Sequence, residues 1–144
     1  MYGLVKLEMN YYQKELKRIK STLYANQAQI EAVIKIRHYI EQNFQAQLNL
    51  DALSETHHIS KYHLIRVFSK YYGLTPRQYL INQRIKQAKQ FLSNGMSVTE
   101  TCFAIGLESL GSFSSLFKRK TGKSPTQFQK EQLSRSNLSS ESRS

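Results

Sequence analysis

Two segments of this 144-residue chain are similar to each other at an offset of 49 residues. One runs from residue 60 to residue 79 and the other from residue 109 to residue 128. Eight pairs agree in a single register: Ser60 with Ser109, Leu64 with Phe113, Val67 with Leu116, Phe68 with Phe117, Gly73 with Gly122, Pro76 with Pro125, Gln78 with Gln127 and Tyr79 with Phe128. Such a repeat predicts two copies of one supersecondary unit.

The matched residues include the signals that begin and end helices. Ser60 and Ser109 each precede an apolar stripe at helical spacing, and a serine oxygen can accept hydrogen bonds from the first backbone amides of a helix. Gly73 and Gly122 stand where such a helix would end in a left-handed residue. Each copy is therefore predicted to contain a capped helix with a glycine stop.

A shorter helix is predicted before each of these capped helices. Asn49 can cap the first, and Ser97–Glu100 has the pattern of a capping box for the second. A tight turn then joins each short helix to the capped helix that follows. This order of elements is a helix-turn-helix, and it is predicted twice, at residues 49–72 and 97–121.

The residues around these units also show helical patterns. Thr75–Gln78 and Ser124–Gln127 are predicted capping boxes with proline at the first helical position. The first box opens a linker helix over residues 76–93, and another helix is predicted over residues 31–44. The fold class is predicted as all-α, with two helix-turn-helix subdomains in about seven helices plus an N-terminal helix.

The two ends are expected to differ from the domain at residues 30–131. Residues 1–29 are predicted to form an amphipathic helical extension, and four of its residues step by four, three and four: Tyr12, Leu16, Ile19 and Leu23. Packing of this helix on the domain, or fraying, is favoured over a dimer formed through a coiled coil. Residues 132–144 are rich in serine and are predicted to be disordered.

The charge of the chain is strongly positive and unevenly distributed. Lys and Arg total 21 against 10 Asp and Glu, which gives a net charge of +11. No acidic residue lies between Glu55 and Glu100, or between Glu108 and Glu131, although both stretches contain many basic residues. Ordinary solvated faces mix both signs, so this pattern favours a polyanionic partner, nucleic acid first and anionic membrane second.

The sequence contains no clear catalytic or metal-binding constellation. The single cysteine, Cys102, occupies a small-residue position of a predicted core helix and is interpreted as a buried inert thiol. His57, His58 and His63 have no neighbouring Cys or acidic residue in a ligand pattern, so they are assigned to a turn and a helix surface rather than to a metal site. No enzymatic activity, metal or cofactor is expected.

The cellular location is predicted from three features. No apolar run approaches the length of a transmembrane helix, and the N-terminus lacks the features of a secretory signal. One cysteine cannot form an intramolecular disulfide. These features indicate the cytoplasm.

Over roughly residues 30–130, the chain resembles the DNA-binding domain of the AraC/XylS family of bacterial regulators. The residues that carry the resemblance are Tyr79, Leu80, Arg84, Ile85, Ala88, Leu92, Ile105–Ser109, Phe113, Phe117–Gly122, Ser124 and Pro125. The resemblance implies a stand-alone DNA-binding form that regulates transcription. Its implied partner is double-stranded DNA, with RNA polymerase as a second candidate and no membrane.

The resemblance also implies which residues face DNA. The recognition helices would be residues 60–72 and 109–121, placed in successive major grooves of an asymmetric site by one protomer bound as a monomer. The implied base-facing residues are Tyr62, Ile65, Arg66, Leu110, Gly111, Ser112, Ser114 and Ser115. The implied contacts to the DNA backbone are Ser60, Lys61, Lys70, Ser109, Lys118 and Arg119.

The two predicted recognition helices differ in chemistry. Arg66 can donate two hydrogen bonds to guanine, whereas Leu110, Gly111 and the serines beside them are apolar or short. Base reading is therefore predicted to reside chiefly in the first unit. Two other functions remain as alternatives, a basic RNA-binding module and a nucleoid-type protein without sequence preference. The RNA alternative is disfavoured because no aromatic sheet platform is predicted.

Overall fold

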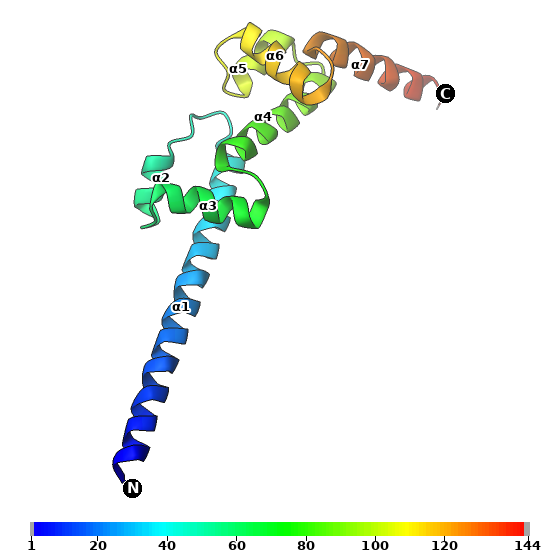
Figure 1. Ribbon diagram of the computed structural model, residues 1–144. Coiled ribbons are helices and arrows are strands. Elements are labelled where there is room, and N and C mark those ends of the chain that lie inside the picture. The colour runs from blue at the N-terminus through cyan, green and yellow to red at the C-terminus, as the bar shows by residue number, and fades with distance from the viewer. Residues whose placement is uncertain (1, 143–144) are drawn as a thin grey trace.

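The computed structural model describes residues 2–142, and the side chains from residue 10 onward. This part of the chain forms seven helices and no strand: α1 (Tyr2–Gln42), α2 (Leu50–Thr56), α3 (Lys61–Tyr72), α4 (Pro76–Ser93), α5 (Val98–Ala104), α6 (Leu110–Thr121) and α7 (Pro125–Glu141). The all-α prediction is confirmed. Figure 1 shows two helical units connected by α4, with the N-terminal part of α1 extending far from both. None of the described helices is long and apolar enough to cross a membrane.

The first unit packs α1, α2, α3 and the start of α4 around one apolar core. Val33, Ile36 and Ile40 repeat at helical spacing along α1, so they share one face, and that face is buried. Leu64 and Phe68 of α3 are fully buried in the same core. One face of α3 is thereby fixed to the domain, and the opposite face is left to solvent.

The second unit has its own core, built from α4, α5 and α6. Ile85 and Leu92 of α4 are buried there together with Phe113 and Phe117 of α6. Cys102 of α5 is fully buried in this core, and burial raises the pKa of its thiol. A thiol with a raised pKa stays protonated at neutral pH, which agrees with the interpretation of Cys102 as an inert core residue.

The local signals for helix ends are found where the sequence places them, but only one of the three predicted capping boxes is complete. Thr75 and Gln78 form both halves of the box at the start of α4. Ser97 Oγ accepts from the amide of Glu100 at 3.1 Å, without a return bond from the Glu100 side chain. Ser124 Oγ accepts from the amide of Gln127, but the Gln127 side chain donates to Glu131 instead of returning to Ser124. The boxes at Ser97–Glu100 and Ser124–Gln127 are therefore only half formed.

The N-terminal extension is continuous with the first helix of the domain. The sequence predicted an extension at 1–29 and a separate helix at 31–44, whereas α1 runs without a break from Tyr2 to Gln42. Its described side chains before Gln29 are almost all exposed. Of the two expectations for this stretch, packing on the domain or fraying, packing is wrong, because the helix carries its apolar residues beyond the end of the core (Figure 1).

The C-terminal segment is helical rather than disordered in the described residues. α7 continues to Glu141, which corrects the prediction of disorder for residues 132–141; residues 143–144 lie outside the described part. Ser134 and Ser139 donate hydroxyl hydrogen bonds to the carbonyls of Lys130 and Arg135, at 2.9 and 3.0 Å. These bonds to the preceding turn give serine a place in a helix that buries little surface.

Thr101 of α5 is a weak point of the second core. Its side chain is fully buried, and among the described residues its Oγ1 has no hydrogen-bond partner. Thr101→Val has nearly the same shape and removes the unsatisfied hydroxyl, so we expect it to raise the free energy of unfolding by about 1 kcal/mol. Urea denaturation followed by circular dichroism measures the change.

Thr121→Val is the matched control for Thr101→Val. Thr121 Oγ1 donates to the carbonyl of Phe117 at 2.8 Å and lies 3.3 Å from the amide of Lys123. Removing this hydroxyl should lower the free energy of unfolding by about 1–3 kcal/mol. A loss of stability in Thr101→Val as large as in Thr121→Val would show that the Thr101 hydroxyl is satisfied.

Candidate nucleic-acid interface

Matching caps give the two predicted recognition helices, α3 and α6, the same length of 12 residues. Ser60 Oγ accepts from the amide of His63 at 3.2 Å, and Ser109 Oγ accepts from the amide of Ser112 at 3.3 Å. At the other end, Gly73 and Gly122 have φ angles of 71° and 83°, in the left-handed region that glycine adopts most easily. The repeat in the sequence therefore corresponds to a repeat of local structure.

The outer face of α3 carries the residues predicted to read bases in the first unit. Tyr62 is 78% exposed and Arg66 is exposed, whereas Ile65 is partly buried. Lys61 Nζ lies 3.5 Å from Asp51 Oδ1, and Lys70 Nζ lies 6.0 Å from the centre of the Tyr71 ring. Arg66 has no ion-pair partner among the described residues, so its guanidinium is available to a ligand.

The outer face of α6 carries short side chains, apart from Leu110. Leu110, Gly111, Ser112 and Ser115 are exposed, and Ser114 is partly buried. A Cβ atom on Gly111 would meet only Ser109 Oγ, at 3.7 Å, which is an ordinary contact. Packing within the protein therefore does not require glycine at position 111. What glycine provides there is an open surface, on which another molecule can approach the backbone closely.

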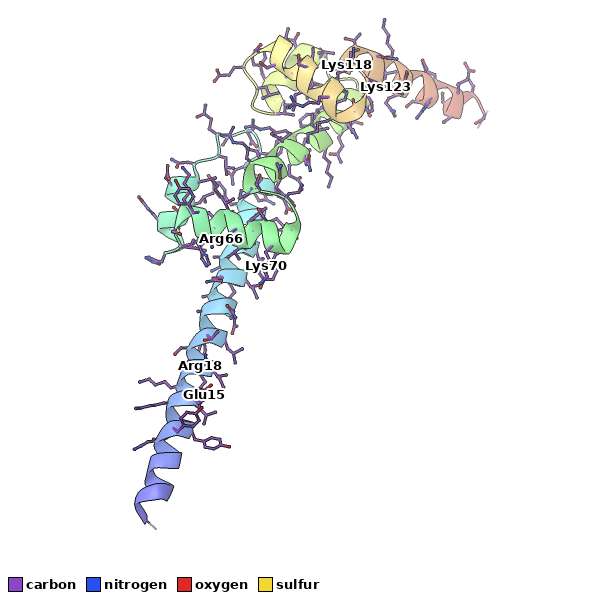
Figure 2. All side chains as sticks on the ribbon, viewed as in Figure 1. Glu15, Arg18, Arg66, Lys70, Lys118 and Lys123 are labelled. Atoms are coloured by element: carbon purple, nitrogen blue, oxygen red, sulfur yellow. The ribbon has the colours of Figure 1, made fainter. Side chains whose placement is uncertain are left out.

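The basic residues near α6 do not all face the same environment. Lys118 and Arg119 are exposed in the last turn of α6. Lys123, which belongs to the same basic stretch, instead pairs with Glu131 of α7. This ammonium group holds the pKa of Glu131 below its usual range. Because Lys123 is paired, the exposed Lys118 and Arg119 are better placed than Lys123 to meet an outside anion. Lys118 and Lys123 are labelled in Figure 2.

The loop between α1 and α2 holds the two units together. Arg84 of α4 donates to the carbonyl of Phe44 at 2.7 Å through Nε and to the carbonyl of Ala46 at 2.9 Å through Nη2. Between those carbonyls, the backbone of Gln45 lies against Gly106, the turn residue of the second unit. Phe44 itself packs against both cores. We call residues 43–47 the bridging loop.

Sequence reasoning did not identify the bridging loop. Arg84 and Gly106 were noted only as parts of the family resemblance and of a tight turn. Their contacts join residues 38–61 positions apart, and no local spacing in the sequence encodes such a distance. The one available signal was Gly106 itself, because a glycine in a turn can mark a close backbone approach.

The relative direction of α3 and α6 follows from this arrangement. Figure 1 shows both helices running roughly from left to right, with their N-terminal ends on the side of α2 and α5. α4 contributes Leu80 to the first core and Ile85 to the second, so one continuous helix belongs to both units. The protein thus carries two similar helices on a shared connecting helix.

The histidines do not assemble a metal site. His57, His58 and His63 line a shallow hollow of about 240 Å³ beside the start of α3. Within the described residues, no three His, Cys, Asp or Glu side chains are placed to hold a metal ion. His58 has a φ angle of 52°, which assigns it to the turn between α2 and α3.

Two capped helix-turn-helix units on one linker helix define the class of tandem helix-turn-helix domains. The chain belongs to the AraC-type helix-turn-helix family: the family model described as "Helix-turn-helix domain" matches residues 53–131. The resemblance inferred from the sequence is thereby confirmed.

The curated relatives are longer than this chain. The "Bifunctional transcriptional activator/DNA repair enzyme AdaA" of Bacillus subtilis is 34% identical over 99 residues, which are 68% of this chain and 47% of AdaA. The "HTH-type transcriptional activator RhaS" of Escherichia coli is 33% identical over 88 residues, 60% of this chain and 32% of RhaS. The chain thus spans about half, or less, of the length of these proteins.

Solved structures share the fold. The DNA-binding domain of AdpA, a global transcriptional factor solved in complex with a target DNA, has a TM-score of 0.67 and 25% sequence identity, and the match covers 72% of this chain and 94% of that one. The match therefore extends over nearly the whole AdpA domain and confirms the two-unit architecture described above.

Proposed function

We propose that this chain is a sequence-specific DNA-binding transcription regulator whose α3 and α6 enter successive major grooves of one asymmetric site. The observation that carries the proposal is the pair of recognition helices. They have equal length, contain no acidic residue and run in roughly the same direction (Figure 1). The names of AdaA and RhaS, and the AdpA structure with its target DNA, support the same class of function.

The site needs no two-fold symmetry, because one protomer supplies both recognition helices. Their outer residues differ, so the two halves of the site should differ in sequence. Helix-turn-helix units on one face of B-DNA meet the major groove about once per helical turn, roughly every 10 bp. The bridging loop contacts both units, through Arg84 and through the backbone beside Gly106, so it would help to keep the two recognition helices in one arrangement on DNA.

The two helices should make different kinds of contact with DNA. Arg66 on α3 can donate two parallel hydrogen bonds to the O6 and N7 atoms of guanine, and Tyr62 can pack on a thymine methyl group or bond to a phosphate. Short side chains at Ser112 and Ser115 on α6 reach phosphates and waters more readily than base edges. Most base discrimination is therefore assigned to the half-site under α3, and α6 chiefly docks on the backbone.

Saturation mutagenesis of a selected binding site tests this division. Base changes under α3 should weaken binding much more than base changes under α6, when both are measured by gel shift at one fixed salt concentration. Equal sensitivity in the two half-sites would contradict it and assign base reading to α6 as well. Equal affinity for the selected site and random duplex would support the nucleoid-type alternative, and preference for single-stranded RNA would support the RNA-binding alternative.

Lys118→Ala tests the proposed role of α6 as a phosphate-docking helix. Phosphate contacts release bound counterions, so their loss lowers affinity on every sequence and makes binding less dependent on salt. We expect Lys118→Ala to weaken binding to the selected site and to random DNA by a similar factor. It should also reduce the magnitude of the slope of log affinity against log salt concentration by about 1. Fluorescence anisotropy over a salt series measures both quantities.

Lys123→Ala is the control for Lys118→Ala. It removes the same charge from the neighbouring turn, but this charge is already paired with Glu131. The salt slope should therefore change less than in Lys118→Ala. Identical slopes for the two variants would mean that overall net charge, rather than a contact at Lys118, controls binding.

A further inference from the structure

The N-terminal part of α1 exposes a row of apolar side chains. We call Tyr12, Leu16, Ile19 and Leu23 the α1 seam; they are 70, 51, 44 and 62% exposed. Figure 2 shows this stretch, marked by Glu15 and Arg18, well away from the helix-turn-helix units. A helix without tertiary packing is only marginally stable in water, and its exposed apolar area favours association. The α1 seam is therefore a candidate surface for binding another molecule.

The α1 seam has the spacing of a coiled coil. Leu16 and Leu23 occupy a positions of a heptad repeat, and Tyr12 and Ile19 occupy d positions. The same alternation of three and four residues continues along the sequence in both directions, through Val5, Met9, Tyr12, Leu16, Ile19, Leu23, Asn26, Ile30 and Val33, with the polar Asn26 as the one interruption of the apolar row. Val33 is buried in the first core, so the row leaves the domain and enters solvent without a change of register.

The charges beside the α1 seam specify one orientation. In the same heptad numbering Glu15 is a g position and Lys20 is the e position of the next heptad. In a parallel pair of helices, each g residue faces the e residue of the following heptad on the partner, so Glu15 of each copy would meet Lys20 of the other. An antiparallel pair brings g positions against g and e against e, where these two residues cannot pair.

We propose that the α1 seam is a dimerisation surface, and that its occupant is α1 of a second copy of this chain in a parallel two-stranded coiled coil. Parallel pairing places both helix-turn-helix domains at the same end of the coil, from which both can reach DNA. Each protomer keeps its own two recognition helices, so a dimer would join two asymmetric sites. The monomer expected from the sequence would then be one half of the assembly.

Seam variants of the full chain test the proposal by light scattering after size exclusion. The unaltered chain should have the mass of two chains at micromolar concentration. Leu16→Glu with Leu23→Glu places charge on the seam and should give the mass of one chain. Tyr11→Glu with Tyr24→Glu is the matched control, because these residues are 69 and 71% exposed on the same helix but outside the seam. The control should remain a dimer.

Charge exchange tests the orientation. Glu15→Lys alone and Lys20→Glu alone should each weaken the dimer, and the two together should restore it, because the parallel pair is re-formed with opposite signs. Within the helix, Glu15 also bonds to Arg18, with Oε1 and Nη2 2.6 Å apart. The double variant cannot restore that internal bond, so recovery of the dimer separates the contact between copies from local helix stability.

The possible results decide the proposal. It is overturned if the unaltered chain has the mass of one chain, if it has the mass of three or four, or if the seam variant and the Tyr11/Tyr24 control have the same mass. Failure of the double charge exchange to restore the dimer overturns the parallel orientation. Because the seam lies outside both cores, the seam variant should still bind a single DNA site, which shows that its domain is folded.

Discussion

Gly106→Ala is expected to lower the free energy of unfolding by about 2–5 kcal/mol. Gly106 has a φ angle of +89°, and a left-handed backbone costs an L-residue about 1–2 kcal/mol. A Cβ atom there would lie 2.3 Å from the carbonyl oxygen of Gln45, so the bridging loop would have to move. Forced overpacking of this kind adds about 1–3 kcal/mol. Urea denaturation gives the total loss.

Gly95→Ala separates the two causes. Gly95 has nearly the same φ angle, +92°, but no atom lies within 4 Å of its Cβ position. It should therefore show only the conformational cost of about 1–2 kcal/mol. If the two variants lose the same stability, the contact between Gly106 and the bridging loop contributes nothing. A larger loss in Gly106→Ala, together with weaker binding to sites that need both half-sites, would show that this contact positions the two units.

The helix-turn-helix units could be predicted because their signals are local. An N-cap serine acts on amides three residues away, and a C-terminal glycine ends the helix that directly precedes it. Ser60, Ser109, Gly73 and Gly122 therefore have the same roles in the structure as in the sequence analysis. The repeat also showed which residues of the two units correspond, since each signal occurs twice at the same offset.

The relation between the units could not be predicted in this way. Arg84 reaches carbonyls 38 and 40 positions away in the chain, and Gly106 lies against Gln45, which is 61 positions away. These contacts form only where the two folded units pack against each other.

The ends of the chain were misjudged for a related reason. Composition indicated weak burial correctly for residues 132–141, but weak burial did not prevent the backbone from continuing as a helix, in which Ser134 and Ser139 satisfy their hydroxyl groups at carbonyls of the preceding turn.

The structure sharpens the contrast between the recognition helices. Both are capped and terminated alike, so the difference that bears on DNA recognition lies in the side chains of their outer faces. Gly111 is not required by packing, and the serines of α6 leave its surface open. Arg66 is exposed and without an ion-pair partner among the described residues. Of the base-facing residues proposed here, Arg66 alone has a cationic group that can donate two hydrogen bonds in one plane.

Arg66→Ala is therefore expected to weaken binding to the selected site by about 5- to 150-fold, which corresponds to about 1–3 kcal/mol for a bidentate contact to a base. The loss should be concentrated at one base pair, so the variant should bind sites altered at that position as well as it binds the original. Lys70→Ala is the matched control from the same helix, because Lys70 is assigned to the DNA backbone. Lys70→Ala should weaken binding to the selected site and binding to random duplex by similar factors. Competition gel shifts at a fixed salt concentration measure both. If Arg66→Ala weakens binding to random duplex as much as binding to the selected site, then Arg66 contacts a phosphate. Base reading by the first unit must then rest on Tyr62 and Ile65.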